Sequence, residues 1–101
     1  MNIQKMMKEM QKMQTKLASA QADLQNKEFT AEAGGGMVKL TIDGNGKLTE
    51  LKIDPKAVDP DDVEALEDLL IAAFHSAFNQ REAATQQIMG SVTGGMKIPG
   101  L

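Results

Sequence analysis

Residues 3–24, IQKMMKEMQKMQTKLASAQADL, repeat apolar side chains at steps of three and four. The repeating positions are Ile3, Met6, Met10, Met13, Leu17, Ala20 and Leu24. A heptad repeat of this kind places one apolar seam along an α-helix that packs lengthwise against another helix. The sequence therefore predicts a long amphipathic helix over residues 3–26, about 36 Å in length because each residue adds about 1.5 Å.

The same helix carries a second stripe, made of Lys5, Lys8, Lys12 and Lys16. At about 100° per residue these four side chains fall within an arc of about 80°, on the side away from the apolar seam. Two interpretations of this stripe stay open at this point. It is either an ordinary solvated face of a coiled coil or a row of cations that contacts the phosphates of a nucleic acid.

After the first helix, alternating apolar and polar residues predict three strands, at residues 28–33, 38–43 and 47–53. Asp43-Gly44-Asn45-Gly46 separates the last two strands and is a strong hairpin signal, since Asn and Gly tolerate positive φ. Simple alternation in the third strand places Thr49, Leu51 and Ile53 on one face and Leu48, Glu50 and Lys52 on the other. The three strands are expected to form an antiparallel meander with one face that needs a cover.

A second helix is predicted from residue 59 to residue 89. Asp59 is expected to cap it, Pro60 suits its first turn, and Gly90 suits its C-terminal cap. The acidic side chains of residues 59–64 complement the positive end of the helix dipole. Its apolar stripe comprises Val63, Leu66, Leu70, Ala73, Phe74, Ala77 and Phe78.

The predicted fold class is α+β, with a long N-terminal helix, a three-stranded antiparallel sheet and a long C-terminal helix. Residues 1–90 are expected to form one domain, and the Gly-rich residues 91–101 a flexible tail. Both helices exceed the size of a compact 100-residue globule, whose radius of gyration is about 13 Å. A homodimer is the simplest way to cover them, with its interface expected at Met10, Met13, Leu17, Leu66, Leu70 and Phe74.

Catalysis has little support in the sequence. The chain has no cysteine, and His75 is its only histidine, with no partner set for general base or metal chemistry. Gly34-Gly35-Gly36 lacks the Lys-Ser/Thr that follows in a phosphate-binding loop. We therefore predict a protein that is not an enzyme and uses no cofactor, no metal and no small-molecule substrate. No export signal and no membrane-spanning run is found.

The net charge of −3 conceals a strong asymmetry. Residues 1–27 hold five lysines and two acids, whereas residues 54–68 hold seven acids and one lysine. Since surface fields are screened over about 8–10 Å, the local sign at the lysine stripe matters more than the total. With no Trp or Tyr and only three Phe, stacking on single-stranded bases is disfavoured, so duplex DNA is the better polyanion.

Several motifs, taken in order, resemble the YbaB/EbfC family of bacterial nucleoid-associated proteins. They are MMKEMQKMQ at 6–14, GGMVKLT at 35–41, KIDP at 52–55, LEDLLIAAF at 66–74, MG at 89–90 and TGGM at 93–96. The resemblance implies a cytoplasmic, nucleoid-associated protein that forms a tweezer-like homodimer and affects nucleoid organisation and gene expression. By similarity its arm helices carry the DNA contacts, here Lys5, Lys8, Lys12 and Lys16, with Arg81 on the second helix as a secondary candidate.

A different class of function stays open beside DNA binding. The methionine-lined N-terminal helix suits a protein-interaction module that binds an amphipathic helix and makes no direct contact with DNA. Such recognition should survive moderate salt and fail when Met10 and Met13 become polar. Phosphate binding should instead fail with salt and with neutralisation of the lysines.

Overall fold

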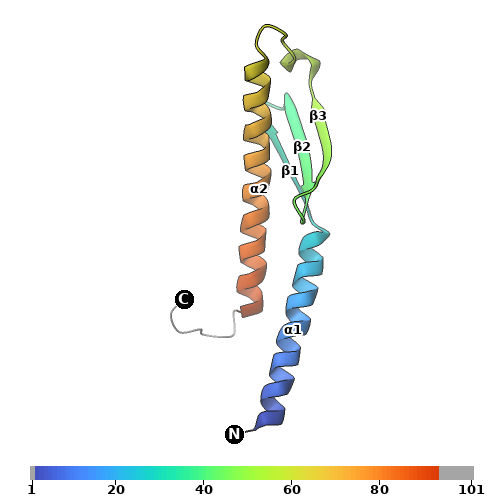
Figure 1. The fold of residues 1–101 in the computed structure, drawn as a ribbon, viewed down its shortest axis with the longest axis vertical. Helices are drawn as coiled ribbons and strands as arrows, with labels where there is room; N and C mark the ends of the chain where they lie inside the picture. Colours follow the sequence, from blue (N-terminus) through green and yellow to red (C-terminus); the bar gives the residue numbers. More distant parts are fainter. Residues whose placement is uncertain (1, 94–101) are drawn as a thin grey trace.

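The computed structural model describes residues 2–93. In chain order the elements are α1 (Ile3–Gln25), β1 (Glu28–Ala33), β2 (Val38–Asp43), β3 (Leu48–Ile53), a short 3-10 turn η1 (Pro55–Ala57) and α2 (Val63–Thr93). Figure 1 shows α2 running the length of the sheet and then beside α1, which extends past the end of α2. The predicted α+β class and element order are confirmed.

The sheet has the order β1-β2-β3, with both pairs antiparallel. α2 contacts β1 and β2 on one face of this sheet. The buried apolar residues there are Phe29, Ala31, Val38, Leu40, Ile42, Ala73 and Ala77. Within residues 63–90 of α2 the two alanines are the buried positions, and their small side chains let the helix approach the sheet closely. The core therefore lies between α2 and the first two strands.

The third strand does not follow the simple alternation expected from the sequence. A β-bulge between Thr41 and Ile42 pairs Ile42 with Leu48, while Leu40 pairs with Leu51. Directly paired residues share a face, so the extra residue brings Leu48 to the same face as Leu51. The prediction that Leu48 faces away from Leu51 is therefore wrong. β3 instead presents an apolar row on the side that α2 occupies.

The ends of α2 also differ from the prediction. The cap is Asp62, whose Oδ1 accepts a hydrogen bond from the Ala65 amide (3.2 Å), whereas Asp59 accepts one from Asp61 and stabilises a preceding turn. Asp59 and Pro60 therefore lie outside the helix. At the other end α2 passes through Gly90 to Thr93, and Gly90 lacks the positive φ of a terminating glycine.

The predicted start of the tail, residue 91, therefore lies within α2. Residues 91–93 belong to α2, and the remaining part, residues 94–101, lies outside the described residues.

The chain is long and thin. Its extents are 72 × 27 × 16 Å and its radius of gyration is 19.8 Å, compared with about 13 Å for a compact chain of 100 residues. It exposes 7718 Å², whereas a compact monomer of 10.9 kDa exposes about 5,600 Å² by the usual scaling with mass. The expectation that both helices are too long for a compact globule is confirmed.

Candidate nucleic-acid interface

The lysine stripe lies on the first four turns of α1. Asn2 starts this helix, because its side-chain oxygen accepts a hydrogen bond from the Lys5 amide at 3.2 Å. All four lysines of the stripe are exposed. From Lys5 to Lys16 the stripe extends about 16 Å along the helix axis at about 1.5 Å per residue. α1 therefore places the four lysines in a row along one side of the helix.

Three of these lysines border one shallow surface hollow. It has a volume of about 430 Å³ and is lined by Lys8, Gln11, Lys12, Thr15 and Lys16. Gln11 and Thr15 are uncharged, so the lysines are the charged groups around the hollow. The Thr15 hydroxyl donates a hydrogen bond to the Gln11 carbonyl oxygen of its own helix at 2.9 Å. Among the described side chains the single ion pair joins Lys52 to Glu50 on β3. The stripe lysines are thus available to an anion.

The apolar seam of α1 is divided into two parts. Met13, Leu17, Ala20 and Leu24 are half-buried, and α1 packs against α2 in this region, where Ala84 and Ile88 are also half-buried. Toward the N-terminus the seam is open, with Ile3 68%, Met6 51% and Met10 62% exposed. This end of α1 is the part that extends past α2 in Figure 1. The lysine stripe therefore begins on a projecting arm, defined here as residues 3–12.

The residues expected at the dimer interface fall into two groups. Leu66, Leu70 and Phe74 pack against the core of their own chain and are half-buried, as are Met13 and Leu17 on α1, whereas Met10 is exposed. The sequence reasoning missed four further apolar side chains at the surface, Leu48, Leu51, Ile71 and Phe78, each 38–53% exposed. The bulge in β3 places the first two there, and local alternation gives no signal for it.

The aromatic pair of α2 extends this exposed surface. The Phe74 and Phe78 rings stack with centroids 6.2 Å apart. A Cβ added to Gly46, in the turn before β3, would lie 3.2 Å from the Phe78 ring. We define Leu48, Leu51 and Phe78, together with the outer edge of β3, as the open apolar face.

Arg81, the secondary DNA-binding candidate, is half-buried rather than free. Its Nε donates a hydrogen bond to the Gly44 carbonyl oxygen at 2.5 Å. It lies on α2, and it is not among the residues that line the hollow bordered by the stripe lysines. His75 is exposed on α2.

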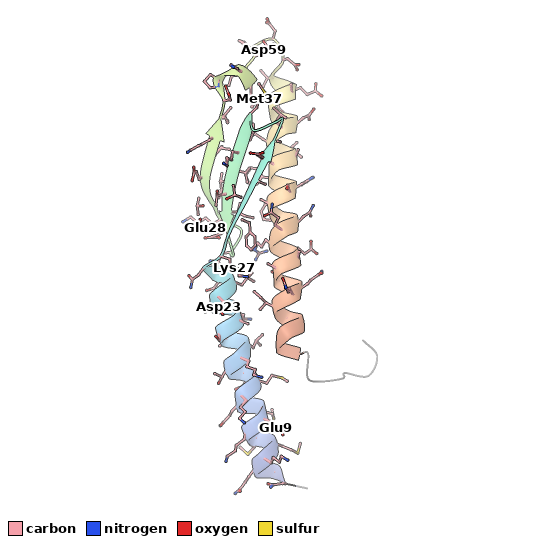
Figure 2. The ribbon with its side chains drawn as sticks, turned by 180° about the vertical axis from the view of Figure 1, so that it is seen from behind. Glu9, Asp23, Lys27, Glu28, Met37 and Asp59 are labelled. Atoms are coloured by element: carbon pink, nitrogen blue, oxygen red, sulfur yellow. The ribbon has the colours of Figure 1, made fainter. Side chains whose placement is uncertain are left out.

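The two ends of the molecule carry opposite charge. Asp54, Asp59, Asp61, Asp62 and Glu64 are exposed around η1 and the start of α2. Figure 2 places Asp59 at this end and Glu9, the single acid of the projecting arm, near the other. Because of this charge distribution, a polyanion is attracted to the arm and repelled by the opposite end.

Within residues 2–93 no group of three or more His, Asp or Glu side chains could hold a metal ion.

Neither helix of the described chain is long and apolar enough to cross a membrane.

Comparison with known proteins identifies a matching family and several relatives of this chain. Residues 1–96 match the model of the YbaB/EbfC DNA-binding family. The chain is 45% identical over 100 residues to a nucleoid-associated protein of Clostridium acetobutylicum, covering 99% of this chain and 89% of that protein. It is 48% identical over 103 residues to a nucleoid-associated protein of Streptomyces avermitilis, covering 99% and 91%.

A solved structure shares the fold. The crystal structure of an uncharacterized protein from Helicobacter pylori superposes with a TM-score of 0.76 at 22% sequence identity, covering 90% of this chain and 96% of that chain.

Proposed function

The chain belongs to the YbaB/EbfC DNA-binding family, and we propose that it is a nucleoid-associated protein that binds duplex DNA as a homodimer, mainly through phosphate contacts. The observation that carries this proposal is the row of exposed lysines on α1, outside the surface that packs on α2. The family is one of DNA-binding proteins rather than of enzymes. Membership of this family also disfavours the alternative that the chain is a protein-interaction module that makes no contact with DNA.

Phosphate contact follows from the chemistry of the stripe. Lysine is a flexible point charge that suits phosphate oxygens but reads base edges poorly. One strand of B-DNA presents a phosphate about every 3.4 Å along its axis, so a stripe about 16 Å long spans about five phosphates. The four lysines of each stripe can therefore each meet a different phosphate. Such contacts fix the protein on the duplex and carry little sequence information.

A homodimer accounts for the large exposed surface. The excess over a compact monomer is about 2,000 Å² per chain, or about 4,000 Å² for two chains, which falls within the range that obligate homodimer interfaces bury in total. We propose that the open apolar face forms the centre of the seam, with the half-buried Leu70 and Phe74 of α2 beside it. The outer edge of β3 has unpaired backbone groups that a second copy can satisfy. The predicted contacts at Met10, Met13 and Leu17 would lie farther along α1.

A dimer of this kind has two arms, one from each chain. Two arms that grip one duplex, or two neighbouring segments, would bend or bridge the DNA and so alter its accessibility. This is how we connect DNA binding with nucleoid organisation, gene expression and a location at the nucleoid. The names of the curated relatives support that location.

Salt-dependent binding of a fluorescent 30-base-pair duplex tests the proposal. The stripe variant changes Lys5, Lys8, Lys12 and Lys16 to Gln. The matched control changes four exposed lysines outside the stripe, Lys27, Lys39, Lys47 and Lys56, to Gln, which removes the same charge. If all eight stripe lysines of a dimer engage phosphates, log K should fall against log salt with a slope of about −7.

We expect the stripe variant to lose this slope and the control to retain most of it. Equal losses in both variants would show that total charge, rather than the stripe, determines binding. If the wild type bound no duplex even at low salt, the proposal would fail and a protein partner for the methionine face would replace it.

A further inference from the structure

The turn between β2 and β3 lies wedged between the two helices. Gly44 is buried, and a Cβ added there would overlap the Leu24 carbonyl group and lie 2.8 Å from the Gln25 Cα. This residue therefore touches the last turn of α1 with its backbone. On the other side, the Arg81 Nε of α2 donates to the carbonyl oxygen of the same glycine. One residue of the turn thus contacts both helices.

The turn itself is firmly built. Asp43 Oδ1 accepts hydrogen bonds from the amides of Asn45 and Lys47, each at 2.9 Å. The Gly46 amide donates to the Asp43 carbonyl oxygen at 3.0 Å. A turn with these internal bonds acts as a rigid block between α1 and α2.

We propose that Arg81 is a positioning residue that sets the angle of the α1 arm through Gly44 and does not itself contact DNA. The proposal rests on the DNA-binding function proposed above. It explains why the second basic candidate is half-buried and hydrogen-bonded to Gly44.

A change in the angle of α1 at Gly44 produces a larger displacement toward the N-terminus of the helix. Lys5 lies about 28 Å from Leu24 at about 1.5 Å per residue. A tilt of α1 by about 10° about its contact with Gly44 therefore moves Lys5 by about 5 Å. This displacement exceeds the length of a hydrogen bond, about 3 Å. A small loss of angular control at Gly44 would thus separate the lysines from the phosphates that they contact.

Two substitutions of Arg81 separate positioning from phosphate contact. In Arg81→Gln, the side-chain amide nitrogen occupies the place of the arginine Nε, so the donor stays and the charge is lost. In Arg81→Lys, a methylene occupies that place and the ammonium lies one bond farther out, so the charge stays and the donor is displaced. Positioning predicts that Arg81→Lys does more damage than Arg81→Gln, whereas phosphate contact predicts the opposite order.

The arm angle is measured without DNA by the distance between spin labels. The chain has no cysteine, so Gln4→Cys on the arm and Glu32→Cys on β1, both exposed, can be labelled alone. Labelled chains are diluted into an excess of unlabelled chain, so that distances report on one protomer. We expect the same distribution in wild type and Arg81→Gln, and a shifted or broader one in Arg81→Lys and in Gly44→Ala.

Duplex binding in the same variants links the angle to function. We expect Arg81→Lys to weaken binding about tenfold, which corresponds to the loss of one hydrogen bond from a charged donor, and Arg81→Gln to weaken it less. Circular dichroism checks the fold. If Arg81→Lys misfolds, Arg81→Met against Arg81→Gln repeats the comparison of donor absent and donor present without any charge.

The results separate the two proposals. An unchanged distance in Arg81→Lys, or weaker DNA binding by Arg81→Gln than by Arg81→Lys, would overturn the positioning role. If the wild type bound no duplex, the proposed function would fail, while the spin-label distances would still decide whether Arg81 sets the arm angle.

Discussion

Replacing Leu51 by alanine tests the proposed dimer seam at one defined point. Leu51 on β3 is paired with Leu40 on β2, so both side chains are on the same face of the sheet. Leu40 is 1% exposed and Leu51 is 42% exposed, because α2 covers β2 and leaves β3 open. In a dimer that covers β3, the exposed part of Leu51 would become buried in both protomers.

The magnitude follows from that exposed fraction. Full burial of a leucine side chain contributes about 1.5–3 kcal/mol. The exposed 42% of two symmetry-related leucines therefore corresponds to about 1–2.5 kcal/mol of dimerisation free energy. Leu51→Ala should raise the dimer dissociation constant about 5- to 70-fold.

Sedimentation velocity over a dilution series measures this dissociation constant. Val58→Ala is the matched control, since Val58 is 56% exposed but lies between η1 and α2, away from the open apolar face. We expect the control to dissociate as the wild type does. An unchanged dissociation constant in Leu51→Ala, or an equal change in Val58→Ala, would refute the placement of the seam on β3.

Three further predictions concern stability and are measured by chemical denaturation at a fixed protein concentration. Leu40→Ala should lower the free energy of unfolding by about 2–5 kcal/mol, because the side chain is fully buried. Gly34→Ala should destabilise more than Gly35→Ala: both have positive φ, but only at Gly34 would the new Cβ meet Leu69, at 2.8 Å. Asp62→Ala should cost about 1 kcal/mol through loss of the cap of α2.

Each of these predictions has a contrary result. A loss below about 1 kcal/mol in Leu40→Ala would mean that the core tolerates the cavity. Equal effects at Gly34 and Gly35 would leave only their shared positive φ as the cause. Asp59→Ala serves as the control for the cap, and a larger loss there than in Asp62→Ala would restore Asp59 as the capping residue.

Local patterns predicted the elements well because local forces decide them. The heptad spacing gave α1, and the rotation of about 100° per residue placed the lysine stripe away from the packed seam. Alternation gave β1 and β2, whose Phe29, Ala31, Val38, Leu40 and Ile42 are buried. In each case the residues that matter are neighbours along the chain.

The errors arose where the outcome depends on tertiary contacts or on a choice between similar signals. The bulge that turns Leu48 toward Leu51 depends on the register between β2 and β3, which alternation within one strand does not contain. Asp59 and Asp62 both satisfy the capping chemistry, and the turn that precedes α2 decides between them. The bond from Arg81 to Gly44 joins residues that are 37 positions apart.

α1 is accessible to solvent along its whole length, and this affects the thermodynamics of DNA binding. None of its residues, all within the described chain, is buried. A free helix shorter than about 12–15 residues is marginal in water, so we expect the backbone amides of the projecting arm to exchange hydrogen with solvent much faster than those of β2. Contact with the duplex would then include the ordering of the arm as part of the binding reaction. Affinity would depend on helix propensity in residues 3–12 as well as on charge, so that a glycine on the exposed side of the arm would weaken DNA binding without removing any contact.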